Sequence, residues 1–113
     1  MPLIKVETNV SLDEPVKTAQ HFSSVVADML GKPESYVLTI VEHDKTMLFG
    51  GEDSPAAFVT LDSIGLPEDR TEEFSAALAV VIQQALGVVP ERAYISFGSI
   101  DRHLLGWSRK TFK

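Results

Sequence analysis

The feature that most constrains the fold is a pattern that occurs twice: an amphipathic stretch, a glycine, a Pro-Glu turn and an apolar run. The first copy passes through residues 30–34 into the run 36–40, and the second through residues 86–91 into the run 94–97. Glycine ends helices in the left-handed conformation, and proline seldom continues them. A β-α-β unit that occurs twice predicts a four-stranded sheet with two helices on one face, an α/β (α+β) fold.

Hydrophobic spacing locates the elements of each copy. Apolar residues recur at three and four positions in both predicted helices, and short β-favouring runs bounded by turn residues mark the strands. The predicted strands are residues 3–8, 37–42, 56–61 and 93–97, and the predicted helices are residues 14–30 and 71–86. Because Val, Ile, Leu and Phe are frequent in these strands, we expect the sheet face without helices to be covered by other copies of the chain.

Composition limits the classes of function. With 113 residues, the chain is expected to form a single domain, residues 1–113. The net charge is −6, and the 10 Lys and Arg residues are scattered, so a nucleic-acid partner is not expected. The absence of cysteine excludes disulfides, a thiol nucleophile and thiolate metal ligands. No apolar stretch approaches the ~20 residues of a membrane span, so we expect no membrane partner and a cytoplasmic protein.

Metal and cofactor motifs are not found. The three histidines, His21, His43 and His103, lack the spacing of metal ligands. The pair Gly50-Gly51 lacks the flanking pattern of a phosphate-binding loop and is interpreted as a turn. We therefore predict neither a metal nor a cofactor.

The N-terminus offers a candidate base. Pro2 follows Met1 directly, and an initiator methionine before a small residue is normally removed, which would leave a free secondary amine on a strand. An α-amino group titrates at roughly 7.7 to 8.0, and burial or a nearby cation would lower that pKa toward neutrality. A base near working pH suits proton abstraction. The alternative is that Pro2 is simply a tolerated second residue.

An ordered set of short motifs resembles the macrophage migration inhibitory factor family of the tautomerase superfamily. The motifs are Met-Pro at 1–2, Thr-Asn-Val at 8–10, Gly-Lys-Pro at 31–33, Phe-Gly-Gly at 49–51, Leu-Asp-Ser-Ile-Gly at 61–65, Arg-Ala-Tyr-Ile at 92–95 and Gly-Trp at 106–107. The resemblance implies the tautomerase fold, a homotrimer with sites between subunits, and cofactor-independent keto-enol tautomerisation of phenylpyruvate-like α-keto acids. Pro2 would be the general base and acid.

The resemblance also assigns residues to the site. Lys32 would pair with the substrate carboxylate or carbonyl, Ile64 would contribute backbone groups, and Tyr94 of an adjacent subunit would hydrogen-bond the keto or enol oxygen. Without the family resemblance, Lys32 is better interpreted as an exposed turn lysine and Tyr94 as a cross-strand packing residue. The family pocket maps onto Tyr36, Leu105, Trp107 and Phe112, although Trp107 and Phe112 could equally seal the trimer.

Three departures from the family pattern affect the expected chemistry. Ser96 stands where the animal cytokine has asparagine, so a shorter donor would reach the substrate less well. Ala56 and Val59 replace a Cys-x-x-Cys motif, so thiol oxidoreductase activity should be absent. Asp62 replaces a histidine, and an acid there would oppose an anionic substrate if it faced the pocket.

The resemblance leaves a second function open. The alternative is a cytokine-like, receptor-binding protein whose pocket is vestigial, and the family is exported without a signal peptide. Receptor binding that survives loss of Pro2 chemistry would favour this alternative.

Overall fold

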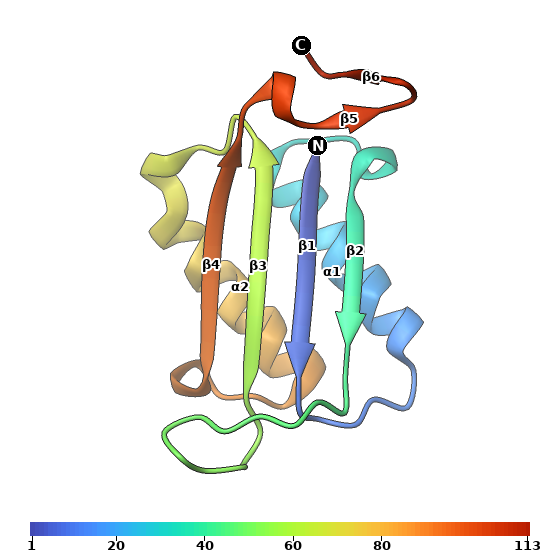
Figure 1. Ribbon diagram of the computed structural model, residues 1–113. Helices are drawn as coiled ribbons and strands as arrows, with labels where there is room; N and C mark the ends of the chain where they lie inside the picture. Colours follow the sequence, from blue (N-terminus) through green and yellow to red (C-terminus); the bar gives the residue numbers. More distant parts are fainter.

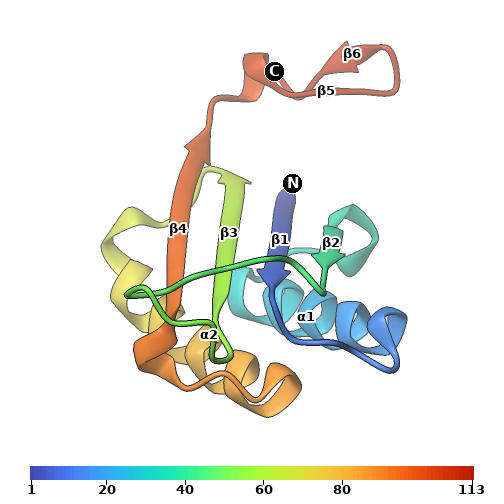
Figure 2. The ribbon, with the colours of Figure 1, turned by 60° about the horizontal axis from the view of Figure 1, so that its bottom comes forward.

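The computed structural model describes residues 1–113 and shows one sheet with two helices on the same face (Figure 1; Figure 2). The sheet has four strands in the order β2-β1-β3-β4. The elements are β1 (Pro2–Thr8), α1 (Pro15–Leu30), β2 (Leu38–Glu42), β3 (Ala57–Ile64), α2 (Thr71–Leu86) and β4 (Ala93–Ile100), followed by the short strands β5 (Gly106–Trp107) and β6 (Lys110–Thr111).

The strand directions confirm two β-α-β units. β1 pairs in parallel with β2, β3 pairs in parallel with β4, and β1 and β3 join the two units in antiparallel register. A parallel pair needs a long crossover, which α1 and α2 supply. The prediction of a four-stranded sheet with both helices on one face is therefore confirmed.

The helices end where the sequence predicted, and for the predicted reason. Gly31 follows α1 at φ 62° and Gly87 follows α2 at φ 70°, both in the left-handed region that disfavours a side chain. At the end of α1, the backbone N–H of Gly31 donates to the Asp28 carbonyl at 3.3 Å, and that of Lys32 donates to the Ala27 carbonyl at 3.0 Å. These bonds fix the position of Lys32 relative to the helix.

The core lies between the helices and the sheet. It is formed by alternate strand residues and by one face of each helix, and its fully buried members include Ile4, Val6, Val59, Leu61, Phe22, Val26, Leu78 and Ile82. Period-two alternation puts the other strand residues on the opposite face. Neither helix is long and apolar enough to cross a membrane.

The segment 43–56 crosses one end of the sheet and is held by hydrogen bonds from distant residues (Figure 1; Figure 2). The Thr8 hydroxyl donates to the Ala56 carbonyl at 2.8 Å, and the Asn9 amide donates to the carbonyls of residues 53 and 54 at 3.1 Å. The Arg92 guanidinium donates to four carbonyls, those of residues 49, 52, 54 and 55, and the carbonyl of residue 54 thus accepts from both Asn9 and Arg92. Two of the family-like motifs, at 8–10 and 92–95, thus anchor this segment.

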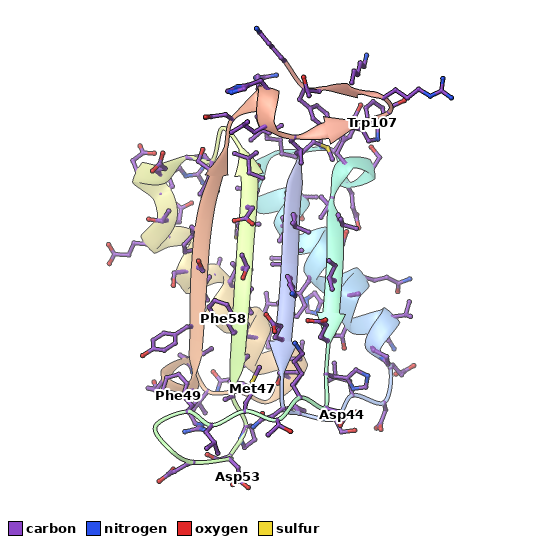
Figure 3. The ribbon with its side chains drawn as sticks, viewed as in Figure 1. Asp44, Met47, Phe49, Asp53, Phe58 and Trp107 are labelled. Atoms are coloured by element: carbon purple, nitrogen blue, oxygen red, sulfur yellow. The ribbon has the colours of Figure 1, made fainter.

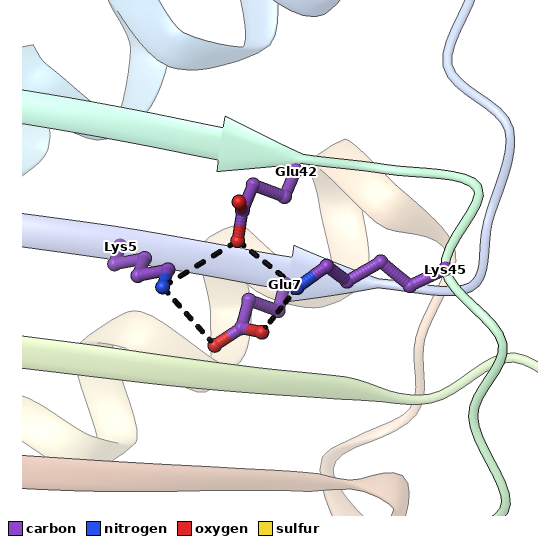
Figure 4. Close-up of polar contacts among 4 residues, drawn as sticks. All are labelled: Lys5, Glu7, Glu42 and Lys45. Carbon is purple, nitrogen blue, oxygen red and sulfur yellow. Dashed lines mark hydrogen bonds and ion pairs between the residues drawn. The ribbon is translucent and has the colours of Figure 1, made fainter.

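The sheet face without helices carries both apolar and charged residues. Leu38 is 56% exposed and Phe58 41% exposed there. Between them lies a four-residue ion cluster, drawn in Figure 4, in which Lys45 Nζ lies 2.6 Å from Glu7 Oε2 and 3.0 Å from Glu42 Oε2, while Lys5 Nζ lies 3.5 Å from Glu42 Oε2. Hydrogen bonds from Lys45 lower the pKa of Glu42 below its ordinary value. The open face is thus only partly apolar, because many of the apolar strand residues point into the core, and its cover by other copies of the chain stays a prediction.

Candidate active site at the N-terminal end of β1

The start of β1 and the C-terminal ends of β3 and β4 lie at the same end of the sheet. Pro2 pairs with Ser63 across β1 and β3, and Ile64 pairs with Ile100 across β3 and β4. Pro2 is fully buried, and Met1 ahead of it is half-buried. The buried N-terminal end of β1 therefore lies beside the loops that follow β3 and β4.

A cavity of about 300 Å³ lies at this edge and brings together four of the residues predicted for the site. Its lining consists of Met1, Lys32, Pro33, Tyr36, Ile64, Arg102 and Phe112. A second cavity of about 510 Å³ shares Met1 and Tyr36 with the first and adds Trp107. Neither lining contains an Asp or a Glu, and the first cavity, with Lys32 and Arg102, suits an anionic ligand.

Aromatic rings form one wall of these cavities. Trp107, which Figure 3 places at this end of the sheet, meets Tyr36 edge-on at 5.8 Å between ring centroids and stacks on Phe112 at 5.9 Å. The Phe112 N–H is 3.2 Å from the carbonyls of both Arg102 and Leu105. Leu105 therefore supports the wall through its backbone, and within one chain it lines neither cavity, so the pocket role of its side chain stays a prediction.

The terminal amine is in an environment that favours its neutral form. Burial lowers the pKa of the Met1 α-amino group below 8.0, and the positive charges of Lys32 and Arg102 lower it further. While Met1 is present, the Pro2 nitrogen is an amide and cannot act as a base. Removal of Met1 would transfer the amine to Pro2, which is more deeply buried and next to the same cavity.

Sequence reasoning missed Arg102, which lines the cavity beside Lys32. A signal for it was present in the topology. Parallel strands end at the same edge of a sheet, so a cation two residues beyond Ile100 falls beside the end of β3, where Ile64 lies. The prediction lacked this signal because it ended the fourth strand at residue 97.

Tyr94 and Ser96 lie away from this cavity within one chain. Tyr94 pairs with Phe58, and Phe58 with Glu7, so Tyr94 is about 17 Å from the Pro2 edge along the strands. Its ring packs on Phe49 at 5.0 Å, and Figure 3 shows Phe49 at the opposite end of the sheet from Trp107. Ser96 follows on the same open face and is exposed. A single chain thus separates these two residues from Pro2 and Lys32.

The residues that depart from the family pattern lie outside the cavities. Asp62 is on the open face of β3 and its carboxylate sits directly over Gly98 of β4, where a larger residue would meet it. Asp62 lines neither cavity, so within one chain it does not oppose an anion bound near Lys32. Ala56 and Val59 are both buried beside β4 and form part of the packing.

Comparison with known proteins agrees with this geometry. The family model of "Macrophage migration inhibitory factor (MIF)" matches residues 1–113. The chain belongs to the MIF family. A MIF homolog of Trichinella spiralis is 36% identical over 99% of this chain and 100% of its own length, and MIF of Mus musculus is 30% identical over 99% of each.

Solved MIF structures share the fold. The structure of MIF from Trichinella spiralis has a TM-score of 0.92 at 35% identity and covers 97% of this chain and 99% of that one. The MIF homologue from Prochlorococcus marinus also has a TM-score of 0.92, at 36% identity, and the match covers 98% of this chain and 99% of that one. The α+β architecture of this MIF-family chain is therefore that of solved members.

Proposed function

We propose that this MIF-family protein is a cofactor-independent keto-enol tautomerase of phenylpyruvate-like α-keto acids, with Pro2 as the base after Met1 is removed. The observation that carries the proposal is the position of the terminal amine: that of Met1 lies half-buried beside two cations in a cavity with an aromatic wall, and Pro2 directly follows it. A neutral amine accepts a proton, Lys32 attracts a carboxylate, and the aromatic wall accommodates an aryl group.

The proton transfer needs no outside reagent. The neutral Pro2 amine removes the proton from the carbon next to the keto group, and the electron pair of that C–H bond forms the enol double bond. The charge that develops on the oxygen is stabilised by a nearby donor, and the protonated amine then returns the proton to that oxygen. Lys32 holds the substrate carboxylate, and the backbone of Ile64 positions the substrate.

The proposal requires neighbouring copies of the chain. Tyr94 and Ser96 are remote from Pro2 in one chain. Their hydroxyls can therefore donate a hydrogen bond to the substrate oxygen only at the cavity of another subunit. A homotrimer with heterologous contacts would give each cavity a Tyr94 from its neighbour. The exposed open face and the exposed Tyr94 ring, 68% accessible in the single chain, support such contacts.

The test joins intact-mass spectrometry to a phenylpyruvate tautomerase assay on one untagged sample. We expect a mass without methionine, clear activity, and loss of most turnover in the Pro2→Gly variant. The matched control is Pro15→Ala at the first position of α1, which should keep its activity because it lies outside both cavities. Unchanged turnover in Pro2→Gly would refute Pro2 as the base. A trimmed, folded but inactive protein would favour receptor binding instead.

A further inference from the structure

Arg102 has a position that the proposed reaction on a monoanionic keto acid leaves unused. It lines the 300 Å³ cavity together with Lys32, and neither cation takes part in any ion pair of the chain. The Arg102 guanidinium makes only one hydrogen bond, a long one of 3.5 Å to the Phe112 carbonyl. The chain as a whole carries a net charge of −6, whereas this cavity is lined by two cations and by no Asp or Glu.

The two cations reach the cavity from different parts of the fold. Lys32 follows α1, which packs on β1 and β2. Arg102 follows β4, the outermost strand on the opposite side of the sheet from β2. One small carboxylate bound at Lys32 would leave Arg102 without a partner while the ligand covered it. Covering an unpaired charge is costly, and a guanidinium matches the planar geometry of a carboxylate with two parallel hydrogen bonds.

We propose that Arg102 is a specificity-determining residue and that the cavity takes a 2-oxo acid bearing a second carboxylate, with one carboxylate at Lys32 and the other at Arg102. This inference rests on the proposed function for the reaction, but its ligand class rests on the cavity alone. The absence of any Asp or Glu from the linings supports it, as does the lowered pKa of the amine that both cations approach. Tyr36 and Phe112 accommodate the apolar part of such a substrate.

The kinetic test compares phenylpyruvate with (4-carboxyphenyl)pyruvate, which differ by one carboxylate. We expect the wild type to prefer the dianion in kcat/KM. Arg102→Met should remove that preference by raising KM for the dianion about tenfold, with about a twofold effect or less on phenylpyruvate. Arg102→Lys should retain part of the preference. Arg109→Met is the matched control, since Arg109 lies in the same C-terminal segment but outside both cavities.

A binding test separates this inference from the proposed reaction. Trp107 is the chain's single tryptophan and lines the second cavity, so its fluorescence reports binding without turnover. The unreactive pair phenylacetate and 4-carboxyphenylacetate should differ in Kd, and Arg102→Met should abolish the difference. If neither keto acid is turned over but this difference in Kd persists, the proposed reaction fails and the ligand class stands. If both are turned over without preference, the inference is overturned and the reaction stands.

Arg102 also has a structural alternative that the same experiment settles. Its carbonyl accepts the Phe112 N–H, so Arg102 could act only by holding Phe112 in place. The hydrogen bond to Phe112 is made by the backbone carbonyl of Arg102, which the Arg102→Met variant retains. Thermal unfolding would verify that this variant is folded. An equal loss of kcat/KM for both keto acids would assign Arg102 to the support of Phe112 and would overturn the specificity role.

Discussion

At the N-terminus, burial and positive charge act in the same direction on one amine. Both lower the pKa of the Met1 amine below 8.0, and we expect the same burial and charges to lower the pKa of the Pro2 amine once Met1 is removed. Replacing Lys32 by Met removes one of the two positive charges. The amine pKa should then rise, and the acidic limb of the pH profile of kcat/KM should move to higher pH.

The control for this prediction is a lysine of the same helical region. Lys17 of α1 has a side chain 77% exposed and pairs with Glu14 away from the cavity near Met1. Lys17→Met should leave the acidic limb in place. If the acidic limb of the pH profile is also unchanged in Lys32→Met, the positive charge of Lys32 does not set the pKa of the amine. NMR titration of the terminal amine in both variants would test the same point without turnover.

At the scale of elements, the turn after α1 links helix geometry to the cavity. Gly31 is left-handed at φ 62°, and a Cβ at this position would meet no atom within 4 Å, so the cost of Gly31→Ala is conformational and not steric contact. We expect a loss of about 1 kcal/mol in the free energy of unfolding, measured by urea denaturation. KM for phenylpyruvate should also rise, because the same turn positions Lys32.

Gly87 provides a matched control at the end of the other helix. It is left-handed at φ 70°, with no atom within 4 Å of a Cβ, and it lines neither cavity. Gly87→Ala should cost a similar amount of stability but leave KM unchanged. An equal rise of KM in both variants would indicate a general loosening of the fold and would contradict the local role of Gly31.

The helices and strands show how much of the secondary structure could be predicted from the sequence. Both helices were predicted to within a residue or so, because their apolar spacing and their glycine ends agree. The strands β3 and β4 extend to Ile64 and Ile100, beyond the predicted ends, since their last residues are stabilised by pairing with each other. The hairpin of β5 and β6 was not predicted, because two residues per strand are too few to show a period. The family resemblance pointed to four residues that line the candidate cavity, Lys32, Tyr36, Ile64 and Phe112, whereas Arg102 depended on the position of the strand end.

At the scale of the whole molecule, the open face determines how copies can meet. Its ion cluster contains two lysines and two glutamates in mutual contact, so the cluster is neutral as a group. A neutral, internally paired cluster costs less to cover than separate charges. Leu38 and Phe58 add exposed apolar area on the same face. This combination is compatible with the homotrimer that we propose, in which each chain completes a site on its neighbour.

The separation of Tyr94 from Pro2 allows that assembly to be tested by complementation. Pro2→Gly should be nearly inactive as a homomer, and Tyr94→Phe should lose roughly 10²-fold in kcat through the missing hydroxyl donor. Co-expression at equal levels would form mixed assemblies in which about a quarter of the sites pair an intact Pro2 with an intact Tyr94 from the neighbour, assuming heterologous contacts. Activity should therefore recover to about a quarter of the wild-type value.

Two measurements make the complementation decisive. Mixing the two purified variants without subunit exchange should give no recovery, and native mass spectrometry should show trimers in the co-expressed sample. The matched control pairs Pro2→Gly with Lys32→Met. Pro2 and Lys32 line the same edge of one chain, so no mixed site can contain both intact residues and activity should stay low. Recovery in this control, or none in the Tyr94 pair, would contradict a site shared between subunits.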